Sequence, residues 1–172
     1  LLRLRVKVND PAKVICIGEA LVDRLGPLGG DPATAAPGDC DERHGGAPAN
    51  VACALARLGT PVAFIGRLGR DAIGDSFLEL LSDRGVDLRG LQSDDQRPSR
   101  VVLVRRDASG ERVFQGFAGD CGAGFADQAL DQAALDPHWP ALAERARWLL
   151  IGTIPLASAP SAAALRSLVA QA

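Results

Sequence analysis

The stretch Gly45-Gly46-Ala47-Pro48-Ala49-Asn50 constrains the fold more than any other part of this sequence. Two adjacent glycines let the backbone bend and approach a ligand closely, and Pro48 suits the first turn of a helix, where its missing N–H costs little. The buried face of that helix is predicted at three residues with helical spacing: Val51, Leu55 and Leu58. We therefore expect a glycine loop facing the positive end of a helix, which suits a polyol or an anion.

Two continuous apolar runs flank this helix and are typical of strands buried on both faces: Lys13–Gly18 and Pro61–Gly66. A second helix is predicted over 75–85, a more exposed strand over 86–91 and a last buried strand over 148–152. The predicted core residues of these later elements are Phe77, Leu78, Leu81 and Trp148. This alternation of strands and helices predicts an α/β fold.

Composition narrows the function classes. The 172 residues suit one domain, and 19 Lys and Arg against 21 Asp and Glu give no sign of a nucleic-acid or membrane surface. No run of 18 apolar residues occurs, which excludes a spanning helix, and Leu1–Val8 lacks the apolar core of a signal peptide, which favours the cytoplasm. The four cysteines form no C-x-x-C pair and have no histidine at ligand spacing, so no metal site is expected.

An acidic residue follows the first strand. The run 13–18 continues through Gly18 and Glu19 to Asp23, and the carboxyl end of a strand is the usual place for a ligand site in α/β proteins. The Asp23 carboxylate offers a charged pair of acceptors for sugar hydroxyls, and Asn50 offers both a donor and acceptors. The alternative for Asp23 is a solvated loop aspartate.

A hairpin interrupts the alternation. Arg100–Arg106 and Glu111–Phe117 flank Asp107-Ala108-Ser109-Gly110, whose Asp, Ser and Gly residues indicate a turn, so we expect the hairpin to project from the main sheet. The segment 26–43 is either an excursion or a mobile flap. Phe114 and Phe117 do not alternate on one face, which suggests that one faces substrate and the other solvent or a partner's lid.

These residues resemble the amino-terminal half of the PfkB (ribokinase-like) carbohydrate kinases. The family's first signature is matched by Gly45 to Asn50, Ala54, Leu58-Gly59, Gly66, Gly69, Asp71 and Gly74. The resemblance implies a three-layer α/β/α core with a small β-lid. It makes residues 1–172 one truncated domain, with lid segments at about 24–44 and 99–118.

The resemblance also implies ATP-dependent phosphorylation of a sugar hydroxyl, and the Glu111–Leu130 region is most similar to the fructokinase branch. Fructose is therefore the favoured sugar, with the lid closing over it. By analogy the substrate-binding residues are Asp23, Gly45, Gly46, Asn50 and Phe117. The intact enzyme would use ATP and Mg²⁺, with a monovalent cation as a further candidate, and would form a homodimer through the lid.

One family motif is missing. The second signature, Gly-Ala-Gly-Asp, supplies the catalytic base and the anion hole and is absent, so the base is expected beyond Ala172. The run Cys121-Gly122-Ala123-Gly124-Phe125 has Phe125 where the aspartate belongs; we favour a return loop over Asp127 as a substitute base. We expect the 172-residue chain alone to bind no cofactor and to be inactive. The alternatives are a non-catalytic sugar-binding or degenerate remnant, and a nucleoside kinase of the same family.

Overall fold

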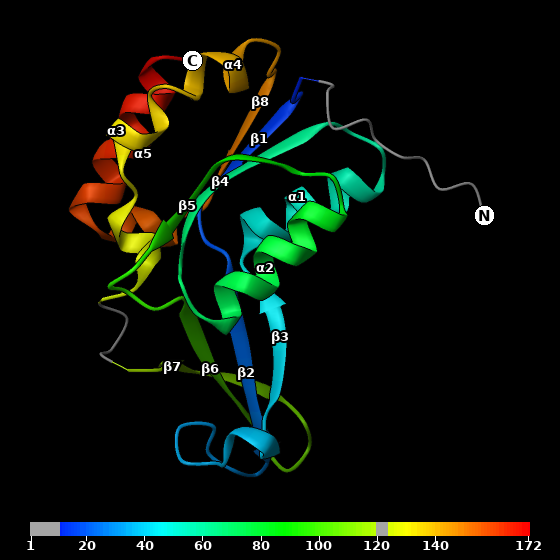
Figure 1. Ribbon diagram of the computed structural model, residues 1–172. Coiled ribbons are helices and arrows are strands. Elements are labelled where there is room, and N and C mark those ends of the chain that lie inside the picture. The colour runs from blue at the N-terminus through cyan, green and yellow to red at the C-terminus, as the bar shows by residue number, and fades with distance from the viewer. Residues whose placement is uncertain (1–10, 120–123) are drawn as a thin grey trace.

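Strand β1 (Val14–Ile17) lies inside a four-stranded sheet in the computed structural model, which describes residues 11–119 and 124–172 (Figure 1). Its neighbours are β4 (Val62–Gly69) on one side and β8 (Trp148–Ile151) on the other, and β5 (Asp87–Asp94) lies beyond β4. All three pairings are parallel. Both apolar runs that flank the glycine loop are therefore strands, as their composition predicts.

Helices cover both faces of this sheet (Figure 1). One face packs against α1 (Ala47–Arg57) and α2 (Ala72–Asp83), with Cys16 of β1 in that core. Ile15 and Ile17 point to the opposite face, since successive side chains alternate along a strand. That face packs against three further helices: α3 (Gln132–Leu135), α4 (Trp139–Ala143) and α5 (Ala159–Ala170). The predicted three-layer α/β/α fold class is confirmed.

The buried face of α1 differs in part from the prediction. Ala49, Ala52 and Ala56 are buried against the sheet, whereas Leu58 is exposed at the end of the helix. Small side chains let the helix lie close to the strands, so the alanines mark its inner face. Val51 and Leu55, also predicted for that face, are partly buried and pack against the same core. In α2, Phe77 and Leu81 are buried as predicted. Leu78 is half exposed and was wrongly predicted to be core.

A second four-stranded sheet lies at one end of the molecule (Figure 1). Its order is β3-β2-β6-β7, formed by β2 (Leu21–Leu28), β3 (Asp41–Gly45), β6 (Arg100–Arg106) and β7 (Arg112–Phe117). We call this the lid sheet. The β2–β6 pairing is parallel and the other two are antiparallel. The segment 26–43 is thus an excursion bounded by two paired strands.

Short 3₁₀ turns complete the described chain: η1 (Pro37–Asp39), η2 (Ala126–Ala129) and η3 (Ile154–Ala157). The predicted 107–110 turn does join β6 to β7, and the Asp107 Oδ1 atom accepts hydrogen bonds from the N–H groups of Ser109 and Glu111. Within the described ranges, every helix is too short or too polar to span a membrane.

Strand β8 forms an edge of the parallel sheet and is more exposed than predicted. Trp148, predicted to be core, has 72% of its surface exposed, and Ile151 is 37% exposed. In the part of the chain that the structure describes, β8 pairs only with β1, so its other edge carries unpaired backbone groups beside apolar side chains. Such an edge promotes association between chains.

We expect Trp148→Lys to reduce self-association of this chain with little change in its melting temperature. A lysine on an exposed strand edge opposes edge-to-edge pairing, and an exposed tryptophan contributes little to the core. Light scattering against protein concentration measures the effect, and Leu58→Lys, an exposed site on α1, is the matched control. Equal reduction by both variants would contradict an association that depends on β8.

Candidate sugar site

Asp23 and Gly45 meet on one face of the lid sheet. They lie on neighbouring antiparallel strands, where Leu21 pairs with Gly45. A Cβ atom added at Gly45 would lie 2.8 Å from Asp23 Oδ2, so only glycine leaves the carboxylate its space. Burial raises the pKa of Asp23, and the charge of Arg112 lowers it in part. Two of the predicted site residues are thus in contact, beside a partly desolvated carboxylate.

The glycine loop leads directly into the N-terminus of α1. Gly46 is the N-cap residue with φ 92°, a left-handed conformation that favours glycine, and a Cβ there would approach Glu19 O to 2.5 Å. Pro48 lies in the first turn, as predicted. Asn50 is exposed in the same turn, and its backbone N–H donates to Gly46 O at 2.9 Å. The loop geometry required by the sequence is therefore present.

Phe117, which is partly buried, packs with Phe125 around a buried charge. The Arg100 guanidinium carbon lies 4.7 Å from the centre of the Phe117 ring and 4.6 Å from that of Phe125. Arg100 also forms a two-point ion pair with Asp127, with N–O distances of 2.6 and 2.8 Å. Both charged side chains are 2% exposed. Asp127, considered above as a substitute base, is therefore an ion-pair partner; residues 120–123 of the nearby loop lie outside the described residues.

Glu19 is a buried acid behind the glycine loop. It follows Gly18 at the end of β1, contacts Gly152, and is 5% exposed. The pKa of Glu19 is raised above its ordinary value, mainly by burial and further by the charge of Asp127. Hydrogen bonds with backbone groups, including those of Ala47 and Ile154, lower it in part. Its Oε2 atom has no hydrogen-bond partner within the described residues. Glu19 thus joins the first residue of α1 to the segment after β8.

Asp71 connects the core to the lid sheet. Its Oδ1 accepts the Gly74 N–H at 2.8 Å and so caps α2, which begins at Ala72 rather than at the predicted Asp75. The same carboxylate accepts the Ser99 N–H at 2.7 Å and the Ser99 hydroxyl at 2.8 Å. Ser99 immediately precedes β6, so this carboxylate fixes where the lid strand leaves the core.

The five predicted substrate-binding residues occupy one region. Asp23, Val102 and Phe117 are paired across three strands of the lid sheet, so the two predicted residues in that row face the same side. Gly45, Gly46 and Asn50 border that row at the start of α1. The sequence analysis did not recognise that Glu19, Arg100 and Asp127 lie close together. A charged residue beside the end of a strand does not reveal, in the sequence, which other charged residue it contacts.

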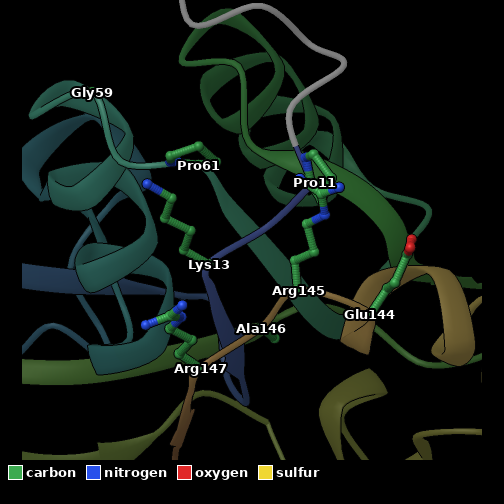
Figure 2. A pocket seen from close by; sticks show the side chains of 8 residues that line it. All are labelled: Pro11, Lys13, Gly59, Pro61, Glu144, Arg145, Ala146 and Arg147. Atoms are coloured by element: carbon green, nitrogen blue, oxygen red, sulfur yellow. The ribbon is translucent and has the colours of Figure 1, made fainter.

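A cavity lies away from the glycine loop, at the other end of the parallel sheet. Its volume is about 790 Å³, and it is at the amino ends of β1, β4 and β8, opposite the glycine loop (Figure 2). Figure 2 shows Lys13, Arg145 and Arg147 around it, with Lys13 extending toward Pro61. Gly59, just past the C-terminus of α1, also lines it. Basic side chains near the negative end of a helix dipole are stabilising, which accounts for this cluster without a ligand.

The residues around the glycine loop do not fit a nucleotide with its metal. The Asp23 carboxylate contacts Gly45, so a triphosphate placed there would face a carboxylate. Within residues 11–119 and 124–172, no three His, Cys, Asp or Glu side chains gather as ligands for a metal ion. No phosphoryl-transfer step follows from these residues, whereas a neutral polyol is compatible with them.

Comparison with protein families gives one match over nearly the whole chain. Residues 11–170 match the model of the pfkB family carbohydrate kinases. Fructokinase-2 of Oryza sativa subsp. japonica is 32% identical over 151 residues, covering 88% of this chain and 43% of the relative. Fructokinase-2 of Zea mays is 35% identical over 147 residues, covering 86% and 42%. The chain thus spans less than half the length of these relatives.

Solved structures agree with the fold. The apo fructokinase of Vibrio cholerae O395 aligns with a TM-score of 0.73 at 32% identity, covering 94% of this chain and 50% of that one. An uncharacterized sugar kinase from Pyrococcus horikoshii, solved in complex with ATP, aligns with a TM-score of 0.75 at 26% identity, covering 92% and 49%. The match again accounts for about half of each neighbour.

Proposed function

The chain belongs to the PfkB family of carbohydrate kinases, and we propose that it is the sugar-binding part of an ATP-dependent kinase whose preferred sugar is fructose. The fructokinases among its relatives support this choice, and one neighbour, from Vibrio cholerae, was solved with fructose and ADP bound. The Asp23 carboxylate beside Gly45 carries the proposal. A carboxylate binds two hydroxyl groups at once, and the acidic loop disfavours a phosphate in the same place.

The remaining parts of the proposal concern the rest of the reaction. ATP, Mg²⁺ and the monovalent cation would be held outside this chain, and the catalytic base would also lie there. The 172-residue chain alone would then bind sugar without phosphorylating it. A cytoplasmic location and a homodimer formed through the lid sheet belong to the same proposal. A nucleoside kinase of the same family is the second candidate for substrate class.

We expect isothermal titration calorimetry to detect fructose binding by the 172-residue chain, weakened about 10- to 100-fold in Asp23→Ala through the loss of charge-assisted hydrogen bonds. Asp83→Ala, an exposed aspartate at the end of α2, is the matched control and should bind like the unaltered chain. Adenosine is titrated in parallel to test the nucleoside alternative.

Four results would count against the proposal. Absence of fructose binding would refute the sugar site, and equal binding by Asp23→Ala would refute its geometry. Tighter binding of adenosine than of fructose would transfer the proposal to nucleosides. Fructose-dependent ADP release from ATP by this chain, lost in Asp23→Ala, would show that the chain is catalytic after all.

A further inference from the structure

Strand β3 has two different faces at the end that leads into the glycine loop. Gly45 borders the Asp23 carboxylate, which marks the candidate sugar site. His44 is the residue before Gly45 on the same strand, so it points to the opposite face of the lid sheet. It pairs with Val22, which belongs to the core that α1 and α2 cover. His44 therefore lies behind the site, on the side of the core helices.

Two successive residues of α2 hold the His44 ring. Its Nε2 atom lies 2.9 Å from Ser76 Oγ, and the ring meets that of Phe77 in an edge-to-face arrangement with 4.6 Å between the centroids. Phe77 is 1% exposed and is part of the core. A side chain of the lid sheet is thus fixed to a buried ring and a hydroxyl of a core helix.

The Ser76 hydroxyl determines which nitrogen of His44 carries the proton in this contact. A serine hydroxyl has one proton, and that of Ser76 is donated to Ile73 O at 2.8 Å within α2. The Ser76 oxygen can then only accept from His44, so Nε2 is the donor. Both the direction of the hydrogen bond and the orientation of the ring are therefore fixed by the backbone of α2.

The packing between β3 and α2 is incomplete beside this contact. A cavity of about 230 Å³ lies between the two elements, with His44 and Ser76 in its wall. The hydrogen bond between these two residues therefore connects elements that are not closely packed along their length. At the N-cap of the same helix, Asp71 holds Ser99 just before β6. The start of α2 thus holds two strands of the lid sheet.

We propose that His44 is a positioning residue for the sugar site, which holds the end of β3 so that Gly45 and Asp23 keep their places relative to the start of α1. The inference rests on the proposed function and adds to it how the core fixes the site. His44 points away from Asp23 and acts without touching the sugar. Because coupling is reciprocal, a contact that favours sugar binding is itself favoured by bound sugar.

The first experiment removes the hydrogen bond from each side. His44→Leu and Ser76→Ala should each weaken fructose binding about fivefold in calorimetric titration, which is about 1 kcal/mol, the contribution of one hydrogen bond. The double variant should bind like either single variant, because both lose the same bond. His44→Gln keeps an N–H donor and should recover most of the affinity. His138→Leu and Ser82→Ala, at exposed positions, are the matched controls and should bind normally.

The second experiment uses the unaltered chain and gives a readout that a purely structural role would not change. The chain has two histidines, so the spectrum of His138→Leu assigns the imidazole signals of His44. Long-range proton–nitrogen correlation should show the neutral His44 ring with its proton on Nε2. Added fructose should shift the His44 signals, although the ring does not contact the sugar, and should leave those of His138 unchanged.

The outcomes separate this inference from the proposed function. Weak binding by Asp23→Ala with normal binding by His44→Leu would overturn the inference alone. It would also be overturned by additive losses in the double variant, by a His44→Gln variant as weak as His44→Leu, or by His44 signals that do not respond to fructose. Absence of fructose binding by the unaltered chain would overturn both. Circular dichroism confirms that each variant is folded, and where one is not, the spectrum of the unaltered chain decides.

Discussion

Asp127→Ala is expected to lower the free energy of unfolding by about 3–5 kcal/mol, because it breaks a buried two-point ion pair with the Arg100 guanidinium by removing one of the two charges. Both side chains of this pair are 2% exposed, so water cannot take over the lost hydrogen bonds without opening the structure. Domains of this size are stable by only about 5–15 kcal/mol, so the variant should be near its unfolding threshold. Urea unfolding followed by circular dichroism measures the loss.

Two further variants give this prediction its controls. Asp95→Ala removes the partner of Arg70 in an ion pair whose side chains are both 70% exposed, and should cost under about 1 kcal/mol. The double variant Arg100→Met/Asp127→Leu removes both charges and should recover much of the lost stability. A double variant as unstable as Asp127→Ala would show that packing around Phe117 and Phe125, rather than the broken ion pair, causes the loss.

Asp71→Ala is expected to cost about 2–4 kcal/mol. It removes the cap of α2, typically worth about 1 kcal/mol, and leaves the Ser99 N–H without its acceptor, at about 1–3 kcal/mol. Because Ser99 begins the path into β6, the lid sheet should also loosen. Hydrogen exchange of the β6 amides, together with the urea midpoint, measures both effects.

The same carboxylate predicts a pH dependence. Burial raises the pKa of Asp71, but the hydrogen bonds from Ser99 and Gly74 outweigh it and leave the pKa below its ordinary value of 3.8. The ionised form is thus favoured by folding, so its contribution is complete above pH 3.8 and is lost as the pH falls through the lower folded-state pKa. The difference in free energy of unfolding between the unaltered chain and Asp71→Ala should therefore become smaller in acid. Asp75→Ala, an exposed neighbour in the same helix, should show no such gap.

The sequence predicted the central strands of the parallel sheet well, because continuous apolar runs mark strands that are buried on both faces. The runs at 13–18 and 61–66 have no polar interruptions, and Gly45 to Asn50 has the loop and helix-start residues in order. The strands of the lid sheet were harder to predict from the sequence. Asp41–Gly45 is polar and mostly exposed, so it lacks the alternation by which strands are recognised, and β2 contains Gly26 and Pro27, which indicate a loop.

The misses at the site and the core have a common cause, which is tertiary context. Arg100 and Asp127 are far apart in the sequence, and neither position shows that its charge is buried. Trp148 has the composition of a core residue and is exposed because its strand lies at a sheet edge. Phe114 and Phe117 share a face only because β7 carries a bulge between them, which depends on the conformation of Gly116.

The parallel pairing of β2 with β6 also has a consequence for the order of assembly during synthesis. As the chain leaves the ribosome, β2 can pair at once with β3, its antiparallel neighbour in sequence, but its other edge has no partner until β6 has emerged. Strand β1 likewise has no partner on either edge until β4, and later β8, has emerged. Because non-local pairings form slowly, nascent chains would expose apolar strand edges for much of translation, and aggregation is expected to compete with folding during that time.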